Sequence, residues 1–224
     1  MAEEINSTVR TSRRSIAEAL LGYSLFCLLS IGSRIYASLW LVVIVFGFAY
    51  PMMWSRLTRI KPPERIHQKS TIASVGWGTL TGVIFSAYCV VSQGAWDQFP
   101  PPFPALQMTI GTFAFAAVLS PFQELFFRAW LQPRLEGVGG PFNSAVLTSL
   151  LFMFWHWLPP FSESGGTSLN VISLPGSIST FLLGMACGVA YWRTRRLLAP
   201  WLAHTIAGAT ITALGKVSFL QMIE

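Results

Sequence analysis

The chain has 224 residues, of which 53% are hydrophobic and only 11% are charged, and its mean hydropathy is +0.54. Soluble globular domains carry about 25% charged residues, so the composition excludes that class and indicates an integral membrane protein. The net charge of +6 could also indicate a nucleic-acid partner. The basic residues lie in the connections between apolar stretches, however, so we interpret them as membrane-topology signals and expect no nucleic acid.

Apolar stretches near the spanning length of about 20 residues follow one another along the whole chain. The first is the least apolar, and the seven stretches cover residues 16–31, 35–54, 71–92, 106–135, 142–158, 176–192 and 198–214. No soluble domain or long linker separates them. The sequence therefore predicts an all-α, polytopic membrane helical bundle of about seven transmembrane helices, forming a single transmembrane domain over residues 1–224.

The basic residues alternate between connections. Lys and Arg occur in segments 10–14, 56–69, 134 and 193–196, whereas connections 93–104 and 159–175 contain neither. By the positive-inside rule, this pattern predicts a cytoplasmic N-terminus and an external C-terminus. Arg34 and Lys216 are then the only basic residues outside.

The cysteines and the paired glycines indicate packing. Cys27, Cys89 and Cys187 all lie in apolar stretches without metal-ligand spacing, so we predict packing roles for them. The glycine pairs 78/82 and 184/188 fit the small-xxx-small pattern that lets helices approach closely. Packing within one chain is the expected use, with dimerisation as the alternative.

Ionisable residues within the apolar stretches predict a buried polar site, because charges in hydrocarbon are costly and usually mark function. Glu124 precedes Arg128 by four residues, which places both on one face of a helix as an ion pair. A purely architectural pair is the alternative. Pro121 removes one helical hydrogen bond just before this pair, so we expect a kink and a carbonyl near Ala117 left free for water.

Two histidines lie at compatible depths. The glycine-rich turn 136–141 joins two antiparallel helices, and Glu124 and His156 lie about 14 and 17 residues from its middle, roughly 20–26 Å deep. His204 follows the basic segment 193–196 by about 9 residues, roughly 14 Å, a difference that helix tilt can close. Each histidine alone could make an interhelical hydrogen bond. Together with the ion pair they predict one shared polar cluster.

Three motifs within about residues 115–213 resemble those of the CPBP family, the CAAX proteases and bacteriocin-processing enzymes, which are Glu-Glu-x3-Arg, Phe-x3-His and His-x3-Asn. The corresponding residues here are Gln123-Glu124-x3-Arg128, Phe152-x3-His156 and His204. The resemblance implies an all-helical membrane bundle with its site enclosed among the core helices. It also implies cleavage of peptide bonds near the membrane, including those that follow prenylated cysteines.

By this resemblance, the first-motif glutamate and the second-motif histidine activate water, and the third-motif histidine and asparagine stabilise the oxyanion. Gln123 replaces that glutamate and Gly208 replaces that asparagine. A glutamine amide cannot accept the proton of a water, and glycine offers no side-chain donor. Glu124 could act as the base only by leaving Arg128. Gln123 indicates either an inactive relative or a Glu→Gln change made to trap an inactive state, and Gly208 favours the first.

The sequence leaves several functions open. The first is an intramembrane endopeptidase, with Gln123, Glu124, Arg128, His156 and His204 as catalytic residues and with Phe152 and Gly208 contacting the substrate. The alternative is a catalytically impaired pseudo-protease that acts as a membrane binding or scaffold subunit. A third hypothesis is zinc or haem bound by the histidines, with Glu124 as a further zinc ligand. It is disfavoured because the histidines lack local ligand spacing and Arg128 opposes a cation. We therefore expect no cofactor and no metal, with zinc as the alternative.

The expected partners are the lipid bilayer, a membrane-associated peptide or protein substrate, and a membrane partner protein. The expected location is the bacterial inner (plasma) membrane, with several spans crossing it.

Overall fold

The computed structural model describes residues 2–36, 38–57, 70–92, 105–158 and 173–214, and these ranges contain helices and no strand. This confirms the predicted all-α class. The elements are α1 (Ala2–Ile35), α2 (Leu39–Leu57), α3 (Thr71–Ser92), α4 (Ala105–Ala114), the π-helical segment η1 (Phe115–Leu119), α5 (Ser120–Glu124), the π-helical segment η2 (Leu125–Leu131), α6 (Gln132–His156), α7 (Leu174–Thr194) and α8 (Leu198–Ala213).

The predicted hairpin around residues 136–141 is present. The chain is helical without interruption from α4 into α6 until Gly140, whose φ of 78° lies in the left-handed region that glycine adopts without strain. The chain reverses direction there, as the hydrogen bond from Arg128 to Thr148 across the turn shows. α6 thus contributes its first residues to one helix and its remainder to an antiparallel helix.

Each of the seven predicted apolar stretches coincides with a helix or half of this hairpin in the described ranges. Four helices are long and apolar enough to cross a membrane, and Leu39–Trp54 is a shorter apolar helix; the four are Arg14–Ile35, Thr71–Ser92, Met108–Gly137 and Leu174–Thr194. The chain is therefore an integral membrane protein. Whether all seven helices cross stays a prediction.

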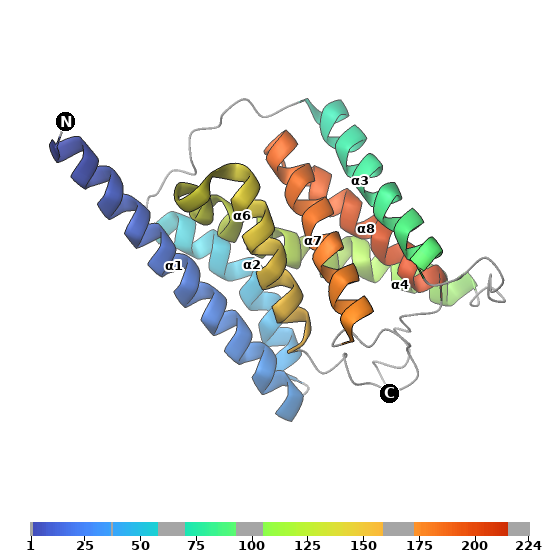
Figure 1. Cartoon of the computed structure of the whole chain (residues 1–224). Coiled ribbons are helices and arrows are strands. Elements are labelled where there is room, and N and C mark those ends of the chain that lie inside the picture. The colour runs from blue at the N-terminus through green and yellow to red at the C-terminus, as the bar shows by residue number, and fades with distance from the viewer. Residues whose placement is uncertain (1, 37, 58–69, 93–104, 159–172, 215–224) are drawn as a thin grey trace.

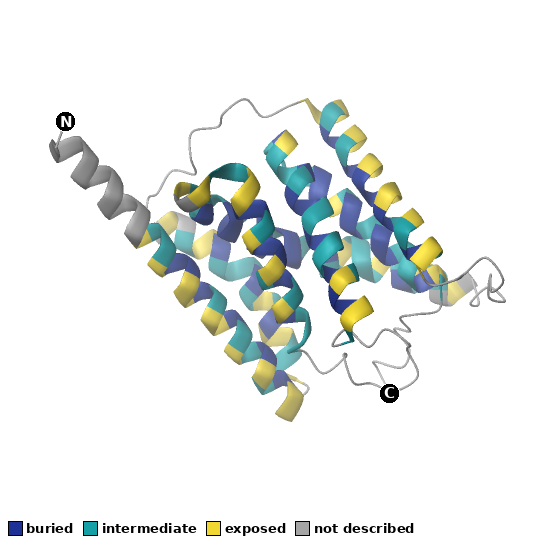
Figure 2. Cartoon of the chain, viewed as in Figure 1, coloured by how far each residue is buried: buried dark blue, intermediate teal, exposed yellow. Residues whose placement is uncertain are grey.

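The bundle has α7 at its centre (Figure 1), with α6 on one side and α3 and α8 on the other. α1 and α2 pack against each other, and α1 also packs against α6. Exposed positions lie along the outer faces of the helices (Figure 2). They include large apolar side chains such as Leu28 on α1 and Ile72 on α3, as expected for a surface in contact with lipid.

Glycines permit the closest helix contacts, as predicted. A Cβ atom added to Gly78 of α3 would lie 2.5 Å from the backbone oxygen of Ala199 on α8, and Gly82 faces Ala203 one turn further. On α7, Gly184 lies against Ser149 of α6, and Gly188 against Ala145. Both small-xxx-small pairs therefore serve packing within the chain, in agreement with the first of the two expectations.

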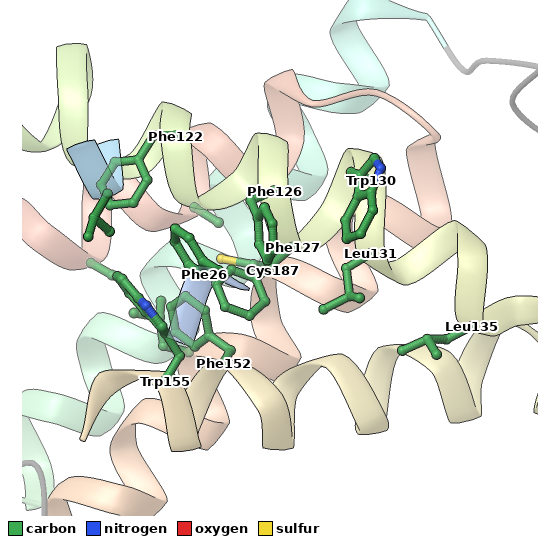
Figure 3. Packing of buried hydrophobic residues seen from close by; sticks show 14 of the residues in the cluster. Phe26, Phe122, Phe126, Phe127, Trp130, Leu131, Leu135, Phe152, Trp155 and Cys187 are labelled. Atoms are coloured by element: carbon green, nitrogen blue, oxygen red, sulfur yellow. The ribbon is translucent and has the colours of Figure 1, made fainter. Parts of the chain in front are cut away.

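An aromatic core joins α1, η2 and α6 (Figure 3). The Phe26 ring stacks on Phe126 with ring centroids 4.2 Å apart and on Trp155 at 5.0 Å, and Phe127 meets Phe152 edge-on at 5.1 Å. All five side chains are fully buried. Such contacts have defined geometry, so they fix the helix that carries Glu124 against the helix that carries His156.

Apart from the buried residues Glu124 and Arg128, charged residues of the described ranges make contacts at two opposite ends of the bundle. At one end, Glu18 accepts hydrogen bonds from Arg14 and Trp54, each 3.0 Å long, and lies 3.6 Å from Arg134. At the other end, Arg34 donates to the carbonyl oxygens of the residues that terminate α6. The placement of basic residues 14 and 134 at one end and 34 at the other agrees with the predicted alternation.

Candidate functional site

Glu124 lies between two π-helical segments, a backbone feature that is frequent at functional sites. In the first segment the N–H of Ser120 donates to the carbonyl of Phe115, five residues earlier. The next donor in this register would be Pro121, which has no N–H. The carbonyl of Ala116 instead accepts a 2.7 Å hydrogen bond from the indole of Trp201 on α8. The expected irregular backbone near Pro121 is present, but this carbonyl is bound to a tryptophan rather than left for water.

A buried carboxylate, guanidinium and imidazole meet at the centre of the bundle. Arg128 Nε donates to Glu124 Oε2 at 3.3 Å, and His204 Nδ1 lies 2.7 Å from Glu124 Oε1. Because a carboxylate only accepts, His204 carries its proton on Nδ1. Arg128 Nη1 also donates to Thr148 at 3.1 Å. Glu124, Arg128 and His204 are each at most 2% exposed, so the structure brings these three predicted residues together.

His156 joins this cluster indirectly. Its Nδ1 donates to the carbonyl oxygen of Phe152 at 2.8 Å, which leaves Nε2 as the acceptor of the ring. The Phe152 ring centroid lies 4.2 Å from that of His156 and 5.9 Å from that of His204. Phe152 therefore packs against both imidazoles. In the described part of the chain, His156 makes no hydrogen bond to Glu124, Arg128 or His204.

Gln123 is buried beside Glu124 and is 4% exposed. Its Oε1 has no hydrogen-bond partner among the described residues. Since buried polar atoms are normally satisfied, this oxygen is a place where a water or a substrate N–H would bind. The amide can orient such a group but cannot remove its proton.

Gly208 faces an aromatic ring. A Cβ atom at this position would lie 2.3 Å from Cγ of Phe115, which belongs to η1. The Phe115 ring also lies near His204, with 6.3 Å between ring centroids. Phe115 therefore fills the space in which the side chain of the family's asparagine would begin. The sequence did not identify Phe115, because its contact with Gly208 joins segments that are far apart in the chain.

Cys187 of α7 is a further member of the cluster. Its sulfur, one carboxylate oxygen of Glu124 and one ring nitrogen of His204 all lie within 4.8 Å of one another. Cys187 also belongs to the buried core in Figure 3, which agrees with the packing role expected for it. Its position between Gly184 and Gly188, on the face of α7 that packs closely, is the sequence signal that could have placed it at the site.

The bundle encloses a buried acid, guanidinium and imidazole, with the half-buried imidazole of His156 beside them. This is the class of membrane protein whose core holds a site for polar chemistry. Residues 102–210 match the family model described as type II CAAX prenyl endopeptidase Rce1-like, and this range contains all three motifs. This segment of the chain therefore belongs to the CPBP family, a family of CAAX-protease-like membrane endopeptidases. Comparison with curated proteins and with solved structures gave no match.

Proposed function

We propose that this chain is a catalytically impaired member of the family, a pseudo-protease that binds a membrane-associated peptide without hydrolysing it. The proposal rests above all on the Phe115 ring, which fills the space beside Gly208. In the family this is where an oxyanion donor is expected. A single missing oxyanion donor typically costs about 10²- to 10³-fold in rate.

The first glutamate position of the first motif supports the same conclusion. Gln123 cannot serve as a general base, and the neighbouring Glu124 has one oxygen bonded to Arg128 and the other to His204. Removing a proton from water would require Glu124 to give up one of these buried contacts. The free Oε1 of Gln123 and the Nε2 of His156 are suited to holding a peptide group.

The experiment restores the family's residues stepwise. A fluorogenic peptide with a farnesylated CAAX end is incubated with the purified chain, with Gln123→Glu, and with Gln123→Glu/Phe115→Ala/Gly208→Asn. We expect no turnover from the unmodified chain and measurable turnover from the triple variant. Gln123→Glu alone should be about 10²- to 10³-fold slower than the triple variant, because the oxyanion donor is still missing.

Binding is measured separately from turnover. We expect the unmodified chain to bind the same peptide saturably, as fluorescence anisotropy would show, and His156→Ala to weaken that binding. A chain that shows no saturable binding would contradict the peptide-binding half of the proposal.

A second candidate function is supported by the 2.7 Å contact between Glu124 and His204. A carboxylate that orients an imidazole is a common general-base arrangement, and it would make the chain an endopeptidase despite Gln123. Turnover by the unmodified chain that Glu124→Gln abolishes, and that Gln123→Ala does not, would establish this function in place of the first.

We further propose that all seven helices cross the bacterial inner membrane with the N-terminus in the cytoplasm. The alternation of basic connections and the grouping of Arg14 and Arg134 at one end of the bundle support this orientation.

A further inference from the structure

Glu124, Cys187 and His204 come from three different helices, α5, α7 and α8, and present one donor atom each within 4.8 Å of the others. All three side chains are buried. We propose that they form a binding site for a zinc ion. The proposal concerns metal binding only, and it does not depend on whether the chain binds or cleaves a peptide.

The donor set suits zinc. Thiolate, imidazole and carboxylate are the three protein ligand types of Zn²⁺, with bonds of about 2.3 Å to sulfur and about 2.0–2.2 Å to nitrogen and oxygen. In a tetrahedron these lengths place ligand atoms roughly 3.3–3.7 Å apart. The observed cluster is therefore within about 1 Å of the required spacing. Three protein ligands leave a fourth position open.

The contacts around the cluster favour a ligand role for Glu124. Arg128 holds Oε2 of this carboxylate and is itself fixed by Thr148. Ligating carboxylates normally have such a hydrogen-bonded partner. Oε1 now accepts a hydrogen bond from His204 Nδ1, and a metal between these two atoms would replace that hydrogen bond. From the sequence we expected Arg128 to repel a cation. In the structure its guanidinium contacts Oε2 of Glu124, whereas the proposed zinc ligand is the other oxygen, Oε1.

The proton and charge balance of binding is simple. The Cys187 thiol, which lies 3.6 Å from the carbonyl oxygen of Pro200 and also contacts the Glu124 carboxylate, would release its proton to solvent. The His204 proton would shift from Nδ1 to Nε2, so that Nδ1 becomes a ligand. Thiolate and carboxylate together neutralise Zn²⁺, while the charge of Arg128 remains. The fourth ligand should therefore be anionic, such as hydroxide.

The test uses zinc itself and Co²⁺ as its spectroscopic substitute. The chain is purified in detergent with a tag that contains no histidines, treated with chelator, and incubated with either metal before the excess is removed. We expect about one zinc ion per chain by elemental analysis. With Co²⁺ we expect the near-ultraviolet charge-transfer band that a thiolate ligand produces.

Cys187→Ser is compared with Cys89→Ser, which alters another buried cysteine, on α3 and outside the cluster. Retained zinc should fall at least tenfold in Cys187→Ser and stay at about one per chain in Cys89→Ser. Thermal unfolding of both metal-free variants shows whether they are folded.

Absence of the thiolate band from the unmodified chain would overturn the proposal without reference to any variant. Equal zinc content in the two variants would also overturn it. Peptide binding measured on the same preparations reports on the proposed function, so failure of one proposal can be told apart from failure of the other.

Discussion

Arg128 is the residue on which the buried charges of the site depend. Its side chain is fully buried, and its guanidinium contacts Glu124, Thr148 and the face of the Phe152 ring, 5.4 Å from the ring centroid. Removal of one member of a buried ion pair leaves the other without compensation, which typically costs about 3–5 kcal/mol. The stability of this region therefore depends on both charges being present together.

We expect Arg128→Met to lower the free energy of unfolding by about 3–5 kcal/mol, because Glu124 would keep a buried charge without its partner. The double variant Glu124→Gln/Arg128→Met should be more stable than Arg128→Met alone. Denaturant unfolding in detergent measures both. Arg14→Met is a matched control, since Arg14 also pairs with a glutamate four residues away but is 65% exposed. It should change stability by at most about 1 kcal/mol. Equal effects of the two single changes would contradict a special role for Arg128.

For individual site residues, the sequence could predict only which neighbours share a helix face and how deep each residue lies in the membrane. The Glu124–Arg128 pair follows from helical spacing, and its proximity to His204 follows from depth. Phe115 and Cys187 could not be placed at the site in this way. The position of Phe115 depends on how η1 crosses α8, which no local pattern encodes. The sequence signal for Cys187 is its place between Gly184 and Gly188 on the closely packed face of α7, and that signal comes from glycine spacing rather than from depth.

The close contact between α3 and α8 depends on individual glycines, and substituting them tests this dependence. Gly78 of α3 lies against the backbone of Ala199 on α8, whereas Gly76, two residues earlier, has no neighbouring atom within 4 Å of an added Cβ. The first position therefore determines how closely two helices approach, and the second does not.

We expect Gly78→Ala to destabilise the protein by roughly 1–3 kcal/mol, because a methyl group cannot be accommodated without moving a backbone. Gly76→Ala should be neutral or slightly stabilising, since alanine is favoured over glycine in a helix by up to about 1 kcal/mol. The melting temperatures of the two variants in one detergent provide the comparison. A loss of stability in Gly76→Ala as large as in Gly78→Ala would show that close approach is not the cause.

The sequence predicts the elements well because a membrane helix requires a long apolar stretch, and such stretches are visible without a structure. It also predicts the hairpin, because Gly140 lies in a glycine-rich turn. The π-helical segments on either side of Glu124 could not be predicted. The bond between Trp201 and Ala116 joins α8 to η1, so the backbone register there depends on a tertiary contact.

For the whole molecule, the two ends of the bundle differ in charge. One end contains the Glu18 contacts described above. At the same end Arg195 pairs with Glu136, and Arg196 donates a hydrogen bond to Thr71 at the start of α3. Residues of α1, α2, α3 and α6 therefore take part in the polar contacts of this end. By the positive-inside rule, we expect this end to lie in the cytoplasm, as proposed above. α3, which is long and apolar enough to span, has Ser70 at this end and Ser92 at the other.

These two exposed serines test the orientation. In intact bacterial cells, a membrane-impermeant maleimide should label Ser92→Cys and leave Ser70→Cys unlabelled until the membrane is permeabilised. The unmodified chain is the control, because Cys89 and Cys187 are buried and Cys27 is half-buried. The reverse pattern would mean that the protein crosses the membrane in the opposite orientation. Equal labelling of both variants in intact cells would mean that α3 does not span the membrane. This would contradict the proposed topology, in which α3 crosses the membrane beside α7 and α8, the helices that carry Cys187 and His204.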